Sequence, residues 1–186
     1  MMFMARLKTA LAGFGRKEDG TIALEAMIVI PVIFWSFLAT FSVFHSFRTY
    51  SINQKAAFTI GDAISRETAP LDDEYLTGAY SLFNYLAGAT GDTAIRVTSL
   101  RWDGNNERFY RDWSKTRGPR PELSNDDVRE WATRLPVMPH NERVMLVETW
   151  ADYEPPFKTG IEQREIRNFI FTRPRFAPRV CWNQCN

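Results

Sequence analysis

The chain has 186 residues, of which 24% are charged and 14% aromatic, and its formal net charge is +1. A charge so close to zero gives no electrostatic reason to expect a nucleic-acid partner. The mean hydropathy is −0.31, so most of the chain is polar, although one stretch near the N-terminus is strongly apolar. We therefore expect a membrane helix joined to one small water-exposed domain.

The apolar stretch covers residues 26–47, which are 22 residues without a formally charged side chain. A helix of this length spans about 33 Å and matches a hydrocarbon core of about 30 Å. The run is too long for a cleaved secretory signal, and no small-x-small cleavage site follows it. It predicts a retained single transmembrane span, with Pro31 as a candidate kink because proline removes one helical hydrogen bond.

Basic residues lie on both sides of this span. Four precede it and three follow it: Arg6, Lys8, Arg16 and Lys17, then Arg48, Lys55 and Arg66. The small excess before the span is only a weak bias toward a cytoplasmic N-terminus. The main ground for this orientation is the motif formed by Gly20 and Glu25. The predicted organisation is a cytoplasmic leader over residues 1–20, a helix over 21–67, and a domain over 68–186 on the other side of the membrane.

Glu25 lies beside the apolar run and needs a physical explanation. An acidic residue at the centre of a membrane helix costs about 2.5–3.5 kcal/mol, and less near the interface. If the chain is cut after Gly20, Thr21 becomes the N-terminus, and its amine is mostly protonated at neutral pH. Glu25 then lies one helical turn from that amine. Its carboxylate can pair with this amine or with the amine of a neighbouring subunit, which would fix the axial register of packed helices.

The residues around Glu25 resemble a known processing motif. Gly-x-x-x-x-Glu before an apolar helix is similar to a type IV prepilin processing site. Residues 20–34 (GTIALEAMIVIPVIF) resemble the TadE-like proteins of the tight-adherence pilus system, whose pattern is matched by Gly20, Ala23, Glu25 and Pro31.

This resemblance, which covers residues 16–45, implies a function. A prepilin peptidase would cut between Gly20 and Thr21 on the cytoplasmic face of the bacterial inner membrane. The product would be a minor pilin or pseudopilin with a periplasmic domain, acting in pilus assembly and open to incorporation into the fibre. Its partners would be the membrane, the peptidase, other pilin-like subunits and the assembly machinery. The major pilins of this system are short and usually carry Tyr after the glutamate, where this chain has Ala26, so the major-subunit role is disfavoured.

Two alternatives stay open. The chain could be an uncut membrane anchor of a periplasmic scaffold protein, with Glu25 at the headgroup level near the helix N-terminus. It could also be a pseudopilin of a secretion system, which shares the processing step and differs in its partners.

The helical pattern continues beyond the span to about residue 67, and Pro70 ends it. Apolar residues recur every four positions, whereas Asn53 falls on another face, and Gly61 is a point where the helix could kink or end. Two stripes within the span are candidates for helix packing: an aromatic one and one of small residues. The apolar repeat is Ile52, Ala56, Ile60 and Ile64; the aromatic stripe is Ile30, Phe34, Phe37, Phe41 and Phe44; the small stripe is Ser36, Ala39, Thr40 and Ser46.

Two further helices are predicted in the domain. The first covers residues 72–86 and ends at the glycines of 88–91. Its core-facing residues would be Leu76, Leu82, Phe83 and Leu86. The second is a short helix that begins after Ser124, whose side chain with Asp127 suggests an N-cap, and ends near Leu135.

Four stretches rich in β-formers predict strands, over residues 94–102, 107–113, 143–153 and 165–172. Residues 103–106 are a strong turn signal between the first two, and residues 116–121 are predicted to be a loop. The expected fold class is α+β: a long N-terminal transmembrane helix followed by a small periplasmic domain with an antiparallel sheet and short helices.

Cys181 and Cys185 are the two cysteines. In an oxidising compartment we expect a disulfide between them that ties down the tail, with intermolecular bridges or free thiols as the alternatives. The spacing and the presence of just two histidines, His45 and His140, argue against a metal site.

No catalytic motif is recognisable, so we expect no enzyme activity and no cofactor. The C-terminal region is basic, which is typical of a solvated face or of contact with an acidic partner subunit. Its arginines are Arg164, Arg167, Arg173, Arg175 and Arg179.

Overall fold

A computed structural model describes residues 21–89 and 91–185. The chain divides into two compact units at the step between Phe44 and His45. One helix, α2 (Thr21–Arg66), contains 46 residues and belongs to both units. Its last residue is one position earlier than predicted. The predicted leader, residues 1–20 with Gly20, lies outside the described residues.

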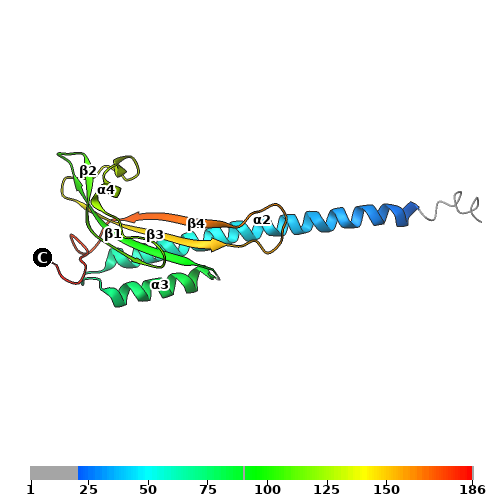
Figure 1. Cartoon of the computed structure of the whole chain (residues 1–186), viewed down its shortest axis with the longest axis horizontal. Helices are drawn as coiled ribbons and strands as arrows, with labels where there is room; N and C mark the ends of the chain where they lie inside the picture. Colours follow the sequence, from blue (N-terminus) through cyan, green and yellow to red (C-terminus); the bar gives the residue numbers. More distant parts are fainter. Residues whose placement is uncertain (1–20, 90, 186) are drawn as a thin grey trace, which may run out of the picture. The chain divides into compact units, whose positions relative to one another are not determined.

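The second unit contains a four-stranded sheet (Figure 1). Its strands are β1 (Thr93–Asp103), β2 (Arg108–Arg117), β3 (Arg143–Tyr153) and β4 (Arg164–Thr172). The order is β2-β1-β3-β4, and every neighbouring pair is antiparallel. The predicted α+β class with a small antiparallel sheet is confirmed.

Strand β2 is longer than predicted, so the prediction of a loop from residue 116 is wrong. The pairing of β1 with β2 shifts by one residue between Ser99 and Leu100, which leaves Asp112 as a bulge. Beyond the bulge the ladder resumes as far as Arg117, and the Thr116 hydroxyl donates to the Ile95 carbonyl at 3.1 Å. The pairing with β1 keeps these polar residues in the strand although their sequence is turn-like.

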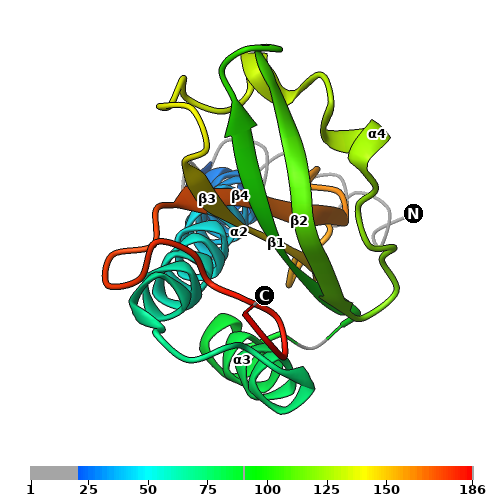
Figure 2. The same ribbon diagram turned by 90° about the vertical axis from the view of Figure 1, so that its left-hand side faces the viewer.

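One face of the sheet is covered by α3 (Asp73–Ala87) and by the part of α2 that follows His45 (Figure 2). The buried core there contains Ala56, Ile60 and Ile64 of α2, Leu76 and Phe83 of α3, and Ile95, Val97, Met145 and Val147 of the sheet. Gly61 does not end α2. A Cβ built there would lie 3.4 Å from Ile170 Cγ2, so the helix lies close to β4.

Helix α3 begins one residue later than predicted, with Asp72 as its N-cap, and ends at Gly88, the first of the predicted terminating glycines. Asp72 Oδ1 accepts a hydrogen bond from the Tyr75 amide at 2.8 Å, and Gly88 adopts a left-handed conformation with φ of 59°. The prediction that Leu82 faces the core is wrong, because Leu82 is 41% exposed. Six residues of helix place Leu82 about 120° from Leu76, whereas seven residues return Phe83 to the same face.

Two other burial predictions need correction. Leu86 is only half-buried, at the edge of the core. Asn53 was predicted on an outer face of α2, yet it is 2% exposed. It precedes Ala56 by three residues, a spacing that places both side chains on one helix face.

The other face of the sheet carries a second, smaller core under the segment between β2 and β3. Ser124 and Asp127 form the predicted capping box at the start of α4 (Asn125–Val128). The predicted continuous helix to residue 135 is wrong, because it breaks into α4 and the 3-10 turn η2 (Trp131–Thr133). This break lets four apolar side chains reach the sheet residues Leu100 and Trp102: Leu123, Val128, Leu135 and Met138.

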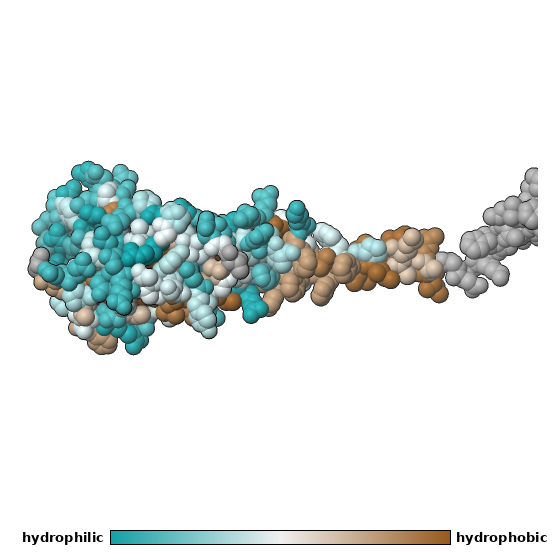
Figure 3. Space-filling model, turned by 60° about the horizontal axis from the view of Figure 1, so that its bottom comes forward, coloured by the Kyte–Doolittle hydropathy of each residue, from teal (hydrophilic) through white to brown (hydrophobic). Residues whose placement is uncertain are grey.

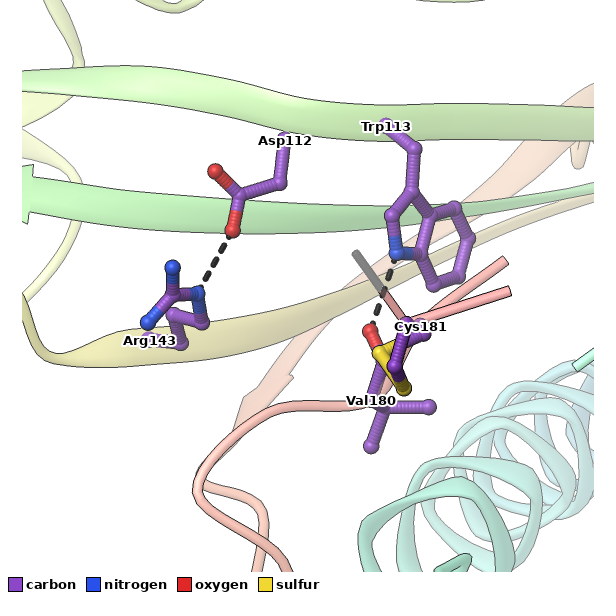
Figure 4. Close-up of a disulfide and its surroundings, with 6 residues drawn as sticks. Asp112, Trp113, Arg143, Val180 and Cys181 are labelled. Carbon is purple, nitrogen blue, oxygen red and sulfur yellow. Dashed lines mark hydrogen bonds and ion pairs between the residues drawn. A yellow bond between two sulfur atoms is a disulfide. The ribbon is translucent and has the colours of Figure 1, made fainter. Parts of the chain in front are cut away.

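The C-terminal segment carries a disulfide between Cys181 and Cys185, with a Cα–Cα distance of 5.3 Å (Figure 4). The Leu71 amide donates to the Cys181 carbonyl at 2.9 Å, and Trp113 Nε1 donates to the Val180 carbonyl at 3.0 Å. Val180 and Cys181 are buried. The segment is therefore a part of the core as well as a tethered tail.

Candidate membrane helix and processing site

The described chain starts with the first turn of α2, where two of the predicted site residues lie. Thr21 is the first helical residue, and Glu25 follows one turn later with an exposed side chain. Residues four apart lie on one helix face, and a helical Cβ tilts toward the N-terminus. The backbone thus directs the Glu25 side chain toward the Thr21 end of the helix. The third processing residue, Gly20, lies outside the described residues.

The following turns of α2 are apolar on every side. Helix α2 is, by length and composition, the one described helix able to cross a membrane. Pro31 lies inside it, and the backbone is helical on both sides of the proline. In Figure 3 brown, hydrophobic atoms gather on the visible face of this part of the helix. Its large side chains are mostly more than 60% exposed, among them Ile22, Met27, Ile30, Ile33, Phe34, Trp35, Phe37 and Phe44.

One hydroxyl of this stretch is paired within the helix. The Thr40 hydroxyl donates to the Ser36 carbonyl at 2.9 Å within the helix. A hydroxyl satisfied in this way carries no unpaired donor into lipid. The exposed apolar surface is much larger than the scattered apolar residues of an ordinary protein surface. These turns therefore have the properties of a surface that lipid or other helices cover.

The sheet domain holds few groups with the arrangement of an active site. Among the described residues, no three His, Cys, Asp or Glu side chains are grouped so that they could hold a metal ion. His45 Nδ1 lies 3.5 Å from the Tyr153 hydroxyl. His140 Nδ1 accepts a hydrogen bond from the Gly104 amide at 3.1 Å at the β1–β2 turn. The two histidines lie at different ends of the domain and do not contact each other.

The acidic residues with shifted pKa values have structural roles. Hydrogen bonds from Asn106 and Asn105, together with nearby His140, lower the pKa of Asp103 in the β1–β2 turn. Hydrogen bonds from the Ser124 backbone and hydroxyl lower the pKa of Asp127 in the capping box. Both carboxylates hold turns in place, which is a structural role.

The basic C-terminal region is exposed and partly ion-paired. Arg175 Nη2 lies 3.0 Å from Asp62 of α2, Arg173 pairs with Glu142, and the Arg164 guanidinium lies 5.4 Å from the centre of the Tyr50 ring. For three of the five arginines, these contacts favour the prediction of a solvated face over contact with an acidic partner subunit. They hold β4 and the segment after it against neighbouring elements.

Sequence reasoning missed a buried ion pair between β1 and β3. Arg96 Nη2 lies 2.6 Å from Glu148 Oε2, and both side chains are at most 10% exposed. The Arg96 guanidinium also donates to the Pro121 carbonyl at 2.9 Å. The sequence did carry a signal for this pair. Arg96 is a basic residue inside the apolar run of β1, and Glu148 is an acidic residue inside the apolar run of β3. The pair lies beside the segment between β2 and β3, through the hydrogen bond to the Pro121 carbonyl.

Comparisons with protein-family models, with curated proteins and with solved structures find no match for this chain.

Proposed function

We propose that this protein is a minor pilin or pseudopilin of a tight-adherence-type pilus, cut after Gly20 by a prepilin peptidase. The observation that carries the proposal is the position of Glu25, one turn after Thr21, at the start of a long helix with apolar side chains exposed on every side. A carboxylate there has a use if the chain begins at Thr21, since it then faces an ammonium group. In an uncut chain the same carboxylate has no such partner in sequence.

The exposed half of α2 supports the membrane and subunit parts of the proposal. Before assembly these turns would span the inner membrane, with the N-terminus in the cytoplasm and the sheet domain in the periplasm. On assembly they would pack against the helices of other pilin-like subunits. The small residues near Ser36 and Thr40 allow close approach of a neighbouring helix, and the phenylalanines around Phe37 offer apolar contact.

Pairing of Glu25 with a neighbour's terminal amine would set the stagger between subunits. An ion pair in a low-dielectric helix bundle is strongly favoured over the two separated charges. Removing one partner leaves the other charge unpaired, which costs about 3–5 kcal/mol when the site is buried. The carboxylate is therefore a register device that becomes active only after cleavage.

The mature N-terminus tests the proposal directly. The protein is extracted from membranes of cells with and without the prepilin peptidase and analysed by intact mass and terminal sequencing. We expect a chain that begins at Thr21 only when the peptidase is present. An intact leader in both strains would overturn the proposal and favour the uncut periplasmic scaffold.

A second experiment separates cleavage from assembly. Glu25→Gln removes the charge and keeps the side-chain shape, whereas Glu74→Gln, on the exposed first turn of α3, is a matched control. We expect the Glu25 variant to be cut but to lose most co-purification with other pilin-like subunits, and the control to behave as the native protein. Normal co-purification of the Glu25 variant would contradict the register role. Co-purified subunits would also distinguish a pilus from a secretion system.

A further inference from the structure

We propose that the free edge of strand β4 binds an extended segment of another protein, which adds a further strand to the sheet. Strands β2 and β4 are the two edges of the four-stranded sheet. An edge strand presents main-chain N–H and C=O groups that pair with an added strand unless the protein covers them. All the residues concerned belong to the second unit.

The ladder between β1 and β3 shows which main-chain groups of β3 face β4. At one end of this ladder the Asp152 amide donates to the Asp92 carbonyl at 3.2 Å. At the other end the Trp102 amide donates to the Glu142 carbonyl at 2.9 Å. The register between these ends is unbroken, so the even-numbered residues of β3 bond to β1. Because successive residues of a strand direct their N–H and C=O to opposite sides, the odd-numbered residues of β3 bond to β4.

The register of β3 with β4 then identifies the free groups of β4. Odd-numbered residues of β3 lie opposite even-numbered residues of β4, from Tyr153 opposite Arg164 to Met145 opposite Thr172. The odd-numbered residues of β4 therefore direct their main-chain groups away from the sheet. They are Glu165, Arg167, Phe169 and Phe171. Within residues 21–89 and 91–185, no hydrogen bond from outside the sheet reaches the main chain of these four residues.

The opposite edge of the sheet is closed by the chain itself. The Arg111 amide of β2 donates to Asn125 Oδ1 at 2.9 Å, and the Arg111 guanidinium donates to the Leu123 carbonyl at 2.8 Å. The Leu123 amide in turn donates to the Ser114 hydroxyl at 3.1 Å. The segment that leads into α4 thus lies beside β2, as Figure 2 shows. Of the two edges, β4 is the one that can accept a further strand.

A cavity at the end of β4 favours an apolar side chain on the added strand. It has a volume of about 420 Å³, and its apolar lining includes Val137, Met138, Val144, Phe171 and Pro174. Phe171 is 45% exposed and Val137 is 84% exposed. Residues opposite each other in neighbouring strands place their side chains on the same face of the sheet. An apolar side chain opposite Phe171 would therefore cover this exposed apolar surface.

The charge of β4 favours an acidic residue four positions away on the added strand. Arg167 and Phe171 lie on one face of β4, because side chains alternate along a strand. The Arg167 side chain is 67% exposed, and the carboxylate 3.8 Å from it, that of Glu165, also pairs with Arg120. A carboxylate opposite Arg167 would give this guanidinium a partner of its own. The partner is therefore an extended segment with an apolar and an acidic side chain four residues apart.

A second copy of this chain does not fit the edge. The part of α2 after His45 runs along β4, because Arg164 lies against Tyr50 and Arg175 pairs with Asp62. Antiparallel pairing of two β4 strands would point the two α2 helices in opposite directions. Two copies in one membrane need the same direction, and this step rests on the proposed function. Pairing of β4 with β2 of another copy is blocked by the segment beside β2.

The test measures amide hydrogen exchange by NMR in the full chain, held in nanodiscs. The probe is a capped heptapeptide with phenylalanine first, glutamate fifth and threonine elsewhere. In antiparallel pairing these two side chains lie opposite Phe171 and Arg167. We expect the outward amides of β4 to exchange at least about fivefold more slowly at saturating peptide. The inward amides of Ile166, Asn168 and Ile170 should be protected with and without the peptide.

A second peptide is the matched control. It carries N-methyl groups on its third and fifth residues, so it keeps the side chains and lacks two N–H donors that would face β4. We expect it to bind at least about fivefold more weakly. Equal binding of the two peptides, or no protection of the outward amides by the first, would overturn the proposal. Protection that appears without peptide and rises with protein concentration would assign the edge to a second copy and also overturn it.

A pair of variants tests the edge from the side of the protein. Arg167→Pro removes an outward N–H, which an edge strand tolerates, and protection of the inward amides checks that the sheet is retained. Arg167→Gln keeps the N–H and loses the charge. We expect peptide binding to fall about two- to fivefold in Arg167→Gln and to be lost in Arg167→Pro. Native binding to Arg167→Pro would contradict the proposal. Because the probe is synthetic, that result concerns the edge alone, and the mature N-terminus still decides the pilin proposal.

Discussion

The two halves of helix α2 share one continuous backbone and meet opposite surroundings. Before Phe44 its large apolar side chains are exposed in every direction, with Ile30 at 64%. After His45 one apolar face is buried against the sheet, with Ile60 at 1%, although Phe47 and Phe58 stay exposed. The second half buries this face within the described chain, whereas the large apolar side chains of the first half stay mostly exposed.

This contrast shows which half of α2 is stabilised by contacts within the described chain. The free energy of the domain half comes from burial of Ile60 and Ile64 against β3 and α3, at about 25 cal/mol per Å² of apolar surface. The exposed half gains nothing comparable from the described chain. We expect a membrane or neighbouring helices to cover its exposed apolar side chains. The two halves should therefore respond differently to the same substitution.

An isoleucine-to-aspartate change in each half should give the largest difference. Ile60→Asp places an unpaired charge in the core, which costs several kcal/mol and should unfold the domain. Ile30→Asp should leave the domain folded and cost about 2.5–3.5 kcal/mol of membrane insertion. Limited proteolysis measures whether the domain is folded, and membrane fractionation measures whether the helix is inserted. A protease-sensitive domain in the Ile30 variant would contradict the expected difference between the two halves of α2.

Gly61 offers a milder test in the domain half alone. Its Cβ position lies 3.4 Å from Ile170 Cγ2 and 4.0 Å from Val147 Cγ2, so there is room for a methyl group but not for a larger side chain. We expect Gly61→Ala to be neutral or stabilising by up to about 1 kcal/mol, because alanine favours the helix. Gly61→Leu should destabilise by about 1–3 kcal/mol through overpacking. Urea unfolding of the solubilised protein measures both, and similar effects of the two changes would contradict the close approach of α2 to β4.

Loss of the disulfide should destabilise the domain somewhat less than overpacking at Gly61. Replacing Cys181 and Cys185 by serine removes a loop of five residues, whose closure is worth about 2 kcal/mol at most. Because Val180 is buried in the same core as Ile64, we expect loosening to reach the contact between the C-terminal segment and Leu71. Hydrogen exchange of the Leu71 amide measures this. An unchanged exchange rate at Leu71 with a faster rate at the last residues would show that the bridge holds only the tail.

The sequence predicted the strong local signals of this fold and missed features set by distant partners. The apolar run to Phe47, the end of α3 at Gly88 and strand β3 each follow from local chemistry, and the structure agrees with them. The burial of Asn53 could not be predicted, because the elements that cover it come from far along the chain. The broken helix after Ser124 depends on a second core that forms only when the sheet exists.

The candidate site was predicted to a different extent. Glu25 and Thr21 were singled out from the motif, and their spacing along the helix follows from helical geometry alone. The cavity lined by His45, Gly88 and Tyr153 had no local signal, because its lining comes from three separate segments. Only packing of α2, α3 and β3 brings these residues together.

The smallest expected effect lies just past the end of α2, where Glu67 approaches Tyr75. Burial of the Tyr75 ring, followed by the charge of Glu67 and a hydrogen bond to it, raises the pKa of Tyr75 to about 12. The folded state thus holds this proton more tightly than the unfolded state, whose pKa is 10.0. The resulting stabilisation is present below pH 10 and is lost as the pH rises toward 12. Glu67→Gln should lower the pKa only partly, because burial is the largest cause.

Tyrosinate absorbance across this pH range measures the shift, and Tyr75→Phe identifies which titration belongs to this residue. In the Glu67 variant we expect a pKa that is lower than in the native protein but still above 10. A return to the unfolded value would mean that Glu67, and not burial, holds the proton. The junction after α2 would then be an open, water-exposed corner, and the core that distinguishes the domain half of α2 would stop short of Tyr75.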